Sequence, residues 1–438
     1  MKRILFFLFI LTAVVAVNAG VTGHSGVSGS TNEDSVLVDT LREQAIDEVV
    51  VTGARYTTTA HAVPMTVSVI DREQLMTAQQ VSILPTLMQH VPGLMLTERG
   101  MLGYGVSGGA AGGISLRGAQ SGLGQVLVLI DGEPQYQGIF GHSIADSYQT
   151  MMAERVEVIR GPASMLYGSN AMGGVINIIT RDAKRDPRVV SGDIHLGAGM
   201  YNTFQGDADM RVSYKDFTMT AAAQYSRTDN HRERMGFQQY GGLLKMGYRC
   251  SDNWSITATA DVTHFDASQP GTVSAPLYEA DQHITRGVAA LSVSNTYERF
   301  TGRISVYDNF GFHTINDGYA EGAAPQKELF RSQDHLLGVS AYETMSLFRG
   351  SHITLGLDYQ FIRGHAWYAD RESGEVVTTG KRGMQSTNSR VHDLAGYLNI
   401  RQDFTDWIAL DAGIRYDYHW VAGGQWIPAV GLITRPVP

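Results

Sequence analysis

A few histidine and tyrosine side chains are the residues of this sequence best suited to holding a metal centre. His142 follows the Asp131-Gly132 turn, and Tyr104 and Tyr136 lie in the same part of the chain. Proteins hold haem iron through histidine or tyrosine, so His142 with Tyr104 or Tyr136 is a candidate ligand set. Four later histidines offer the same chemistry: His231, His283, His313 and His365. The commoner alternative is that His142 is a solvent-exposed loop residue without a ligand.

Motifs for enzymatic chemistry or nucleotide binding are weak. The sequence has no HExxH motif and no serine elbow between a strand and a helix. The Gly-rich stretch 100–113 contains no GxGxxG that joins a strand to a helix and no Walker lysine. Cys250 is the single cysteine, which excludes an internal disulfide framework and a CxxC site. A pI near 5.9 argues against a nucleic-acid partner, which would need a basic surface.

The first nineteen residues have the pattern of a signal peptide. Lys2 and Arg3 precede an apolar run over 4–17, and Val17-Asn18-Ala19 offers small residues at a cleavage point. The apolar run is shorter than the roughly 20 residues that a transmembrane helix needs. The sequence therefore predicts export through a signal peptide at 1–19.

The second half of the chain predicts strands. From Ile408 to Trp420 apolar and polar residues alternate, and the same period of two recurs in 217–225, 254–262 and 353–361. These runs are about ten residues long, the length that a tilted strand needs to cross a bilayer. A soluble β-sandwich also alternates and is the competing interpretation.

Aromatic residues and loop lengths favour a membrane barrel. The apolar faces end in aromatics such as Trp254, Tyr359 and Trp420, as in interfacial girdles. Short links near 215–216, 252–253, 298–299, 349–350 and 405–406 alternate with long polar segments at 228–237, 266–284, 314–333 and 364–390. Short periplasmic turns and long extracellular loops are typical of outer-membrane barrels.

About twelve strands are expected over 187–438, and the sequence end argues against a closed barrel. Outer-membrane barrels usually finish on an aromatic-ended strand, whereas Arg435-Pro436-Val437-Pro438 carries two prolines, which remove backbone donors. An open edge in lipid leaves unsatisfied backbone groups. We therefore expect a C-terminally truncated, incomplete barrel.

A mixed α/β region precedes these strands. Residues 66–70, 114–117, 126–130, 156–159 and 175–180 are expected as short strands. Asp71 is placed to N-cap a helix over 72–77, with Gln74 completing a capping box. Ile83, Leu84, Leu87 and Met88 have helical spacing up to Val91-Pro92-Gly93. The predicted fold is thus a mixed α/β plug domain over 53–186, followed by a transmembrane antiparallel β-barrel.

Two segments lead into this domain. Residues 20–45 are rich in Gly, Ser, Thr and Val and are expected to be a flexible periplasmic lead-in. A short acidic and then β-branched stretch follows, suited to adding an edge strand to a partner protein, and equally to being the first strand of the next domain. Its residues are Ile46, Asp47, Glu48, Val49, Val50, Val51 and Thr52.

Five stretches resemble TonB-dependent outer-membrane receptors. Residues 46–55 look like the TonB box and first plug strand of that family. Ser115-Leu116-Arg117-Gly118, 128–132, 155–164 and 166–180 resemble successive plug motifs, in the family's order. The resemblance implies a plug inside a 22-stranded barrel in the outer membrane of a Gram-negative bacterium, and so about the first twelve strands here. Within the plug, Arg117, Glu157 and Arg160 are expected as internal ion pairs.

The resemblance also implies a function and partners. We expect a receptor, not an enzyme, that imports a scarce nutrient with energy from the inner-membrane TonB-ExbB-ExbD complex. Expected partners are the C-terminal domain of TonB, outer-membrane lipid, a small-molecule iron complex or haem, and, as an open alternative, a surface ligand-binding lipoprotein. No resident cofactor is expected. A haem or ferric siderophore ligand is favoured; a cobalamin receptor of the same fold and a passive porin or adhesin remain alternatives.

Overall fold

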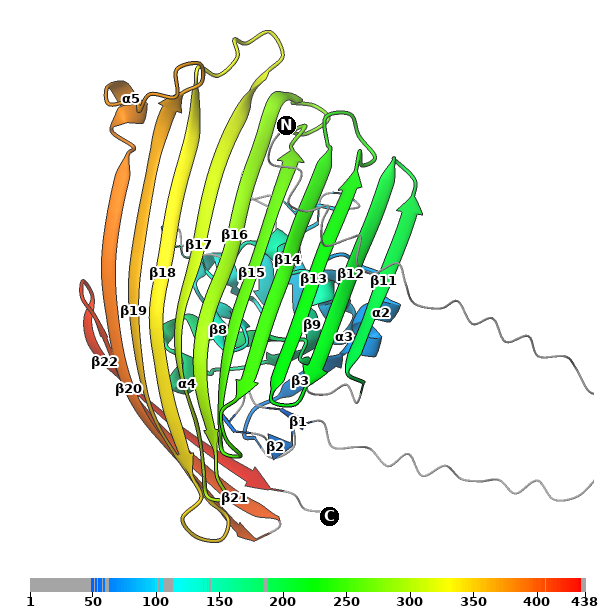
Figure 1. Ribbon diagram of the computed structural model, residues 1–438. Helices are drawn as coiled ribbons and strands as arrows, with labels where there is room; N and C mark the ends of the chain where they lie inside the picture. Colours follow the sequence, from blue (N-terminus) through cyan, green and yellow to red (C-terminus); the bar gives the residue numbers. More distant parts are fainter. Residues whose placement is uncertain are drawn as a thin grey trace, which may run out of the picture. The chain divides into compact units, whose positions relative to one another are not determined.

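Twelve antiparallel strands, each paired with the next in sequence, form one sheet in the second part of the chain. We call this sheet the wall. Figure 1 shows its strands side by side in sequence order. Their bounds are β11 (Val190–Gly199), β12 (Thr203–Tyr214), β13 (Phe217–Thr228), β14 (Phe237–Arg249), β15 (Trp254–Ser268), β16 (Leu277–Thr296), β17 (Phe300–Ala320), β18 (Glu328–Met345), β19 (Ser351–Asp370), β20 (Thr387–Thr405), β21 (Ile408–His419) and β22 (Gly423–Thr434).

The structure is a computed structural model that describes residues 49–50, 52, 54–56, 58–59, 63–98, 100, 102–104, 113–136, 138–139, 141, 143–183, 188–405 and 407–434. The predicted signal peptide and lead-in lie outside these residues, as do Ile46, Asp47, Glu48, Val51 and His142. Strands β11 and β22 are the two ends of the described sheet and do not pair with each other. No helix in the described part of the chain is long and apolar enough to cross a membrane.

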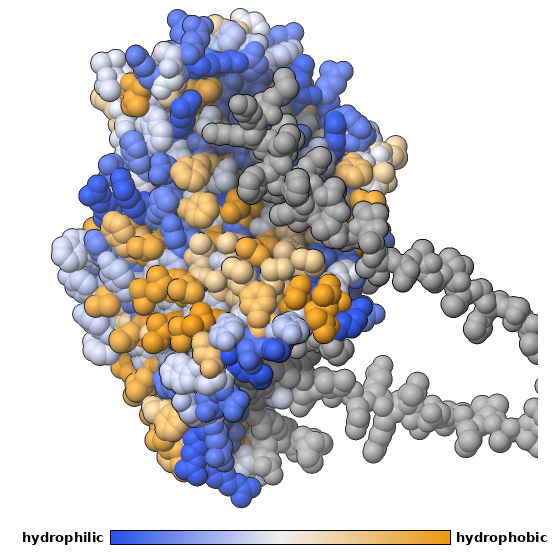
Figure 2. Space-filling model, in the orientation of Figure 1, coloured by the Kyte–Doolittle hydropathy of each residue, from blue (hydrophilic) through white to orange (hydrophobic). Residues whose placement is uncertain are grey.

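The faces of the wall are reversed relative to those of a soluble sheet. On β13 the inward residues Thr220 and Ser226 are polar and buried, whereas on β19 the outward Leu357 is 64% exposed. Figure 2 shows hydrophobic residues gathered across the middle of the visible face, between more hydrophilic ends. An apolar outer band with a polar interior is the pattern of a sheet that faces lipid, so the predicted transmembrane strands are confirmed.

Several strands are longer than predicted. Strands β16 and β17 contain 20 and 21 residues, and the connection between β15 and β16 shrinks to 269–276. The prediction of strands of about ten residues, with loops over 266–284 and 314–333, is wrong there. The backbone hydrogen bonds between strands form whatever the polarity of the side chains. The strands therefore stay paired beyond the apolar band, where their sequence is polar.

The remaining described elements form the plug, a smaller domain that packs against the wall. Its main sheet has the order β3-β9-β10-β7-β8, with bounds β3 (Val67–Asp71), β9 (Ala153–Ile159), β10 (Gly174–Thr180), β7 (Val126–Ile130) and β8 (Glu133–Pro134). Strands β7 and β10 are parallel, and the other pairs are antiparallel. Smaller sheets are formed by β4 (Leu94–Leu96), β5 (Ile114–Leu116) and β6 (Ala119–Gln120), and by β1 (Val49–Val50) and β2 (Thr58–Thr59).

Two short helices follow β3, as the sequence predicts. Helix α2 (Arg72–Thr77) begins at Asp71, whose side chain accepts from the N–H of Gln74 at 2.8 Å, while Gln74 accepts from the N–H of Asp71 at 3.0 Å. Helix α3 (Ile83–His90) is capped by Ser82. These caps satisfy backbone donors that a helix start leaves free. Further short turns are α4 (Ser164–Tyr167) in the plug and α5 (Gly380–Gly383) in the wall.

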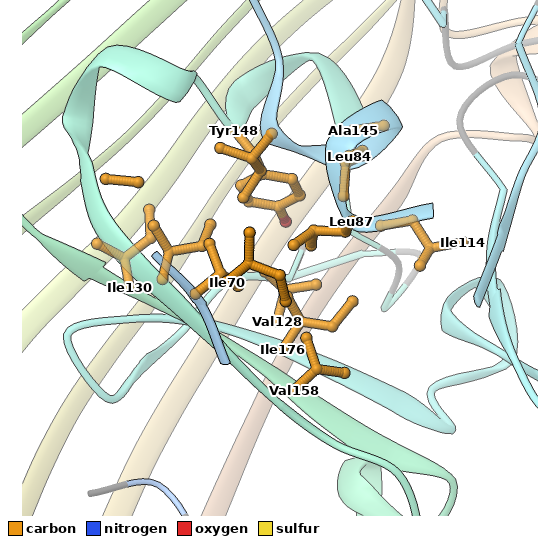
Figure 3. Packing of buried hydrophobic residues seen from close by; sticks show 14 of the residues in the cluster. Ile70, Leu84, Leu87, Ile114, Val128, Ile130, Ala145, Tyr148, Val158 and Ile176 are labelled. Carbon is orange, nitrogen blue, oxygen red and sulfur yellow. The ribbon is translucent and has the colours of Figure 1, made fainter. Parts of the chain in front are cut away.

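The plug has its own apolar core between these helices and the main sheet. Figure 3 shows Leu84 and Leu87 of α3 facing Val128, Val158 and Ile176 of the sheet. Burying apolar surface at about 25 cal/mol per Å² stabilises this packing. The core therefore holds β7, β9 and β10 as a rigid platform, and the polar residues at the edge of that platform meet the wall.

Candidate functional site

Thr52, the last residue of the predicted TonB box, is clamped inside the plug. It is fully buried, and both its N–H and its hydroxyl donate to Oε2 of Glu157, at 2.8 and 2.5 Å. Its hydroxyl accepts from Nδ2 of Asn177 at 2.9 Å, and its carbonyl accepts from the hydroxyl of Tyr167 at 2.8 Å. We call these four residues the Thr52 clamp. It ties the box to β9, β10 and α4.

A charged pair supports the clamp from β9. Nη2 of Arg155 lies 2.7 Å from Oε1 of Glu157, which leaves Oε2 for Thr52. Residues two apart on a strand share a face, which explains why Arg155 reaches Glu157. Among the predicted ion-pair residues, Arg117 instead donates from Nη1 to the carbonyl of Arg160 at 3.0 Å. Arg155 was missed, although its i, i+2 spacing from Glu157 was visible in the sequence.

Arg55 links the segment after the box to the wall. Its guanidinium lies 4.2 Å from the ring centre of Tyr167 and 5.3 Å from that of Tyr342 on β18. Nη2 also donates to the carbonyl of Leu166 at 3.0 Å. Guanidinium groups stack favourably over aromatic faces, so Arg55 holds the start of the plug beside both α4 and the wall.

The turn after β7 meets the wall through an ion pair. Asp131 lies 3.0 Å from Nζ of Lys245 on β14 and accepts from the N–H and hydroxyl of Thr180, at 2.9 and 2.5 Å. Burial alone would raise the pKa of Asp131, but Lys245 and the Thr180 hydrogen bonds outweigh burial and hold it below its ordinary value. Asp131 is therefore ionised at neutral pH.

A second carboxylate, that of Glu133, lies on the same edge, and its pKa is shifted in the opposite direction. Glu133 accepts from the hydroxyl of Ser305 at 2.5 Å and lies 3.3 Å from Nη2 of Arg303. Burial raises the pKa of Glu133, and Arg303 and Ser305 only partly offset this shift. Arg303 also donates to the carbonyl of Asp131 at 3.1 Å. One arginine of β17 thus holds two adjacent points of the plug.

Further along, backbone groups of the plug bind wall side chains. Asn309 of β17 donates to the carbonyl of Pro134 at 3.0 Å. The N–H of Gly138 donates to Asp334 at 2.9 Å, and Asp334 also accepts from Arg286 at 2.8 and 2.9 Å. We call residues 131–138 the seam, because Asp131, Glu133, Pro134 and Gly138 contact side chains of β14, β17 or β18.

The structure does not bring the candidate ligand tyrosines together. Tyr104 packs in the plug core and lines a pocket of about 280 Å³ with Phe237 of β14. Tyr136 packs in another cluster, where its hydroxyl donates to Gln360 of β19 at 2.7 Å. Burial raises the pKa of both phenols, so both stay protonated at neutral pH. The prediction for His142 stays a prediction, because that residue lies outside the described part of the chain.

The later histidines do not converge on one site, and His283 and His313, at neighbouring positions of β16 and β17, point to opposite faces of the wall. His283 contacts Asp266 at 2.5 Å on the outward face, His365 stacks on Trp367 at 4.5 Å, and His313 is buried. His231 lies in the 229–236 connection. Within the described residues, no group of three or more His, Cys, Asp or Glu side chains is arranged to hold a metal ion.

Comparison with known proteins identifies the plug. Residues 59–175 match the family model of the TonB-dependent receptor plug domain. The vitamin B12 transporter BtuB of Vibrio cholerae is 28% identical over 226 residues, which cover 50% of this chain and 35% of BtuB. The chain therefore spans about a third of the length of the curated relatives it matches.

Solved structures share the fold. The ferripyoverdine receptor of Pseudomonas aeruginosa aligns with a TM-score of 0.71 and 16% identity, over 88% of this chain and 57% of that chain. The alcaligin receptor FauA of Bordetella pertussis aligns with a TM-score of 0.69 and 15% identity, over 89% and 63%. At this identity the likeness concerns the fold.

The plug-domain match, the clamped box and the lipid-facing wall define a class of protein. Residues 59–175 form the plug domain of a TonB-dependent receptor, and the lipid-facing wall places the chain in the outer membrane. This family consists of receptors and transporters.

Proposed function

We propose that this receptor binds a bulky nutrient at the cell surface and imports it into the periplasm, driven by TonB through residues 46–52. The Thr52 clamp is the observation that carries the proposal. A segment suited to edge-strand pairing ends in a residue with four hydrogen bonds to the plug interior. Force on the box would act on its pairing with β2 and on Glu157, Tyr167 and Asn177 before it reached the rest of the plug.

The seam supports a division of labour within the plug. Ion pairs from Lys245 and Arg303 attach 131–133 to the wall, while the clamp contains only plug residues. Breaking the clamp leaves these plug–wall contacts in place. The proposed import cycle therefore begins with release of Thr52 while the seam still holds, which opens a path without expelling the plug.

For the ligand we propose an iron complex, which is either haem or a ferric siderophore. Solved structures of the same fold include receptors for ferripyoverdine and for alcaligin, and this likeness of fold supports the proposal. The receptor itself carries no cofactor in this proposal. Cobalamin is the second candidate, because the curated relatives that match are vitamin B12 transporters.

Transport assays on whole cells separate these candidates. The gene product is expressed in cells lacking their own receptors, with and without TonB, and uptake of a ferric siderophore, haem and cyanocobalamin is measured. We expect uptake of one iron complex, dependent on TonB. Uptake of cyanocobalamin alone would replace the iron proposal, and uptake that persists without TonB would overturn energy coupling. For haem, a spectral titration with hemin of the wild type and a His142→Ala variant adds a test; without a Soret shift in the wild type, haem is excluded.

A further inference from the structure

Three basic side chains lie side by side on the outer face of the wall. In the strand registers His335 of β18 is opposite Arg363 of β19, and Arg363 is opposite Arg390 of β20. Arg363 has the same parity as the exposed Leu355 and Leu357 on β19, so it points outward. We call His335, Arg363 and Arg390 the basic rung.

The basic rung lies at the boundary between the apolar band and the long connections. On β19 the outward residues run from Leu357 through Tyr359 and Phe361 to Arg363, and the strand ends at Asp370 before the connection 371–386. On the neighbouring strand, Nδ1 of His392 shares a hydrogen bond of 2.8 Å with the hydroxyl of Tyr359. Aromatic residues followed by charged residues mark the level of lipid headgroups. The longest connections lie at this end of the wall, which makes it the outer leaflet.

The two arginines have no partner in the described part of the chain. Neither Arg363 nor Arg390 forms an ion pair or side-chain hydrogen bond with a described residue, although both are exposed. Like charges directly opposite each other destabilise a strand pair. By contrast, Arg227 of β13, which also points outward, pairs with Asp229 at 3.1 Å. His335 lies 3.0 Å from Asp308, so the carboxylate in this region lies beside the histidine and away from the two arginines.

We propose that the basic rung binds a phosphate group of a lipid in the outer leaflet. Opposite residues have Cβ atoms about 4.5–5.5 Å apart, so both guanidinium groups can reach one phosphate. Each presents a planar fork of N–H donors that matches phosphate oxygens. Below the rung, Leu394 is 56% exposed and Leu357 is 64% exposed, which gives acyl chains an apolar surface. This surface distinguishes a phosphorylated lipid from a free anion. The proposal does not depend on which nutrient is transported.

Lipid retention by the full gene product tests this proposal. The protein is purified into nanodiscs of zwitterionic phospholipid, and binding of phosphorylated lipid A and of dephosphorylated lipid A is measured. We expect the affinity for the phosphorylated lipid to be about tenfold higher. This ratio corresponds to a binding free-energy difference of about 1.4 kcal/mol, close to the contribution of one hydrogen bond to a charged group. The double variant Arg363→Ser with Arg390→Ser is expected to lose this preference.

Matched variants make each outcome decisive. Arg227→Ser, which removes an equally outward arginine with its own carboxylate, is expected to bind as the wild type does. Arg363→Lys with Arg390→Lys keeps both charges and is expected to keep most of the preference. Equal binding of the two lipids by the wild type overturns the proposal even where the serine variant fails to assemble. Binding of inorganic phosphate as tightly as of phosphorylated lipid A would assign the rung to a free anion and would also overturn it.

Discussion

Thr52 illustrates which roles of a single residue can be predicted from the sequence and which cannot. Because it ends an acidic and β-branched stretch, it was predicted to be part of the TonB box. Its partners Glu157 and Asn177 lie 105 and 125 residues away, and no local pattern connects them. Likewise, Arg117 and Arg160 were chosen by charge, but pairing depends on which side chains share a strand face. Arg155 shares that face with Glu157.

Thr52→Val should loosen the clamp while preserving the shape of the side chain. The change removes the hydroxyl that donates to Glu157 and accepts from Asn177, which leaves buried polar groups short of a partner. We expect unfolding of the plug to become easier by about 1–3 kcal/mol. Denaturant unfolding in detergent measures this change. Thr387→Val at the exposed start of β20 should change the free energy by less than about 0.5 kcal/mol. Equal effects of the two variants would contradict a specific clamp.

The Asp131–Lys245 pair should make stability depend on acid pH in a particular direction. Since the folded-state pKa of Asp131 lies below its ordinary value of about 3.9, the ionised carboxylate stabilises the fold above that pH. This stabilisation is lost as the pH falls through the folded-state pKa. Asp131→Asn should therefore cost about 3 kcal/mol at pH 7, because Lys245 loses its counter-charge, and progressively less as the pH falls below about 3.9.

To check this prediction, the free energy of unfolding is measured at several pH values for the wild type and for Asp131→Asn, and the two are compared. Glu298→Gln, in a tight turn of the wall, serves as a control that should show little difference at any pH. A difference for Asp131→Asn that is the same at pH 3 and pH 7 would show that the charge of Asp131 contributes nothing.

Among the elements, regular patterns were predictable and lengths were not. Period-two alternation predicted the wall strands, and the capping box Asp71 to Gln74 predicted α2, because both signals are local. Strands β16 and β17 exceeded their predicted length because their outer arms are polar and pair through the backbone alone. The pairing order of the plug sheet, with β9 and β10 central, depends on contacts between distant segments and left no local signal.

A charge placed in the apolar band of β19 should impair the wall. Leu357 is outward and 64% exposed, so Leu357→Arg would face lipid near the middle of the band. We expect a cost of about 2–4 kcal/mol, as for an arginine near the midplane of an outer-membrane barrel. Unfolding in lipid vesicles measures this cost. Glu372→Arg in the connection 371–386 is the control and should assemble normally. Equal assembly of both variants would place Leu357 outside the lipid.

For the whole molecule, the central claim is that the box drives a plug that the wall holds in place. The resemblance predicted a plug inside a 22-stranded barrel, of which about the first twelve strands were expected here, and the structure shows a plug packed against a twelve-stranded antiparallel wall. The seam was not predictable, because it pairs 131–138 with wall residues between 114 and 224 positions later. Such contacts depend on how two domains pack, and their residues look like ordinary polar positions in each sequence segment.

The most direct test separates binding from import. A variant lacking residues 47–51 keeps Thr52 and the seam but loses the edge strand that TonB is proposed to pair with. Once the ligand is identified, surface binding and uptake are measured in cells for this variant and for a control lacking residues 25–29. We predict that the 47–51 deletion binds ligand as the wild type does and imports none, while the control imports normally. Import that continues without residues 47–51 would contradict the account.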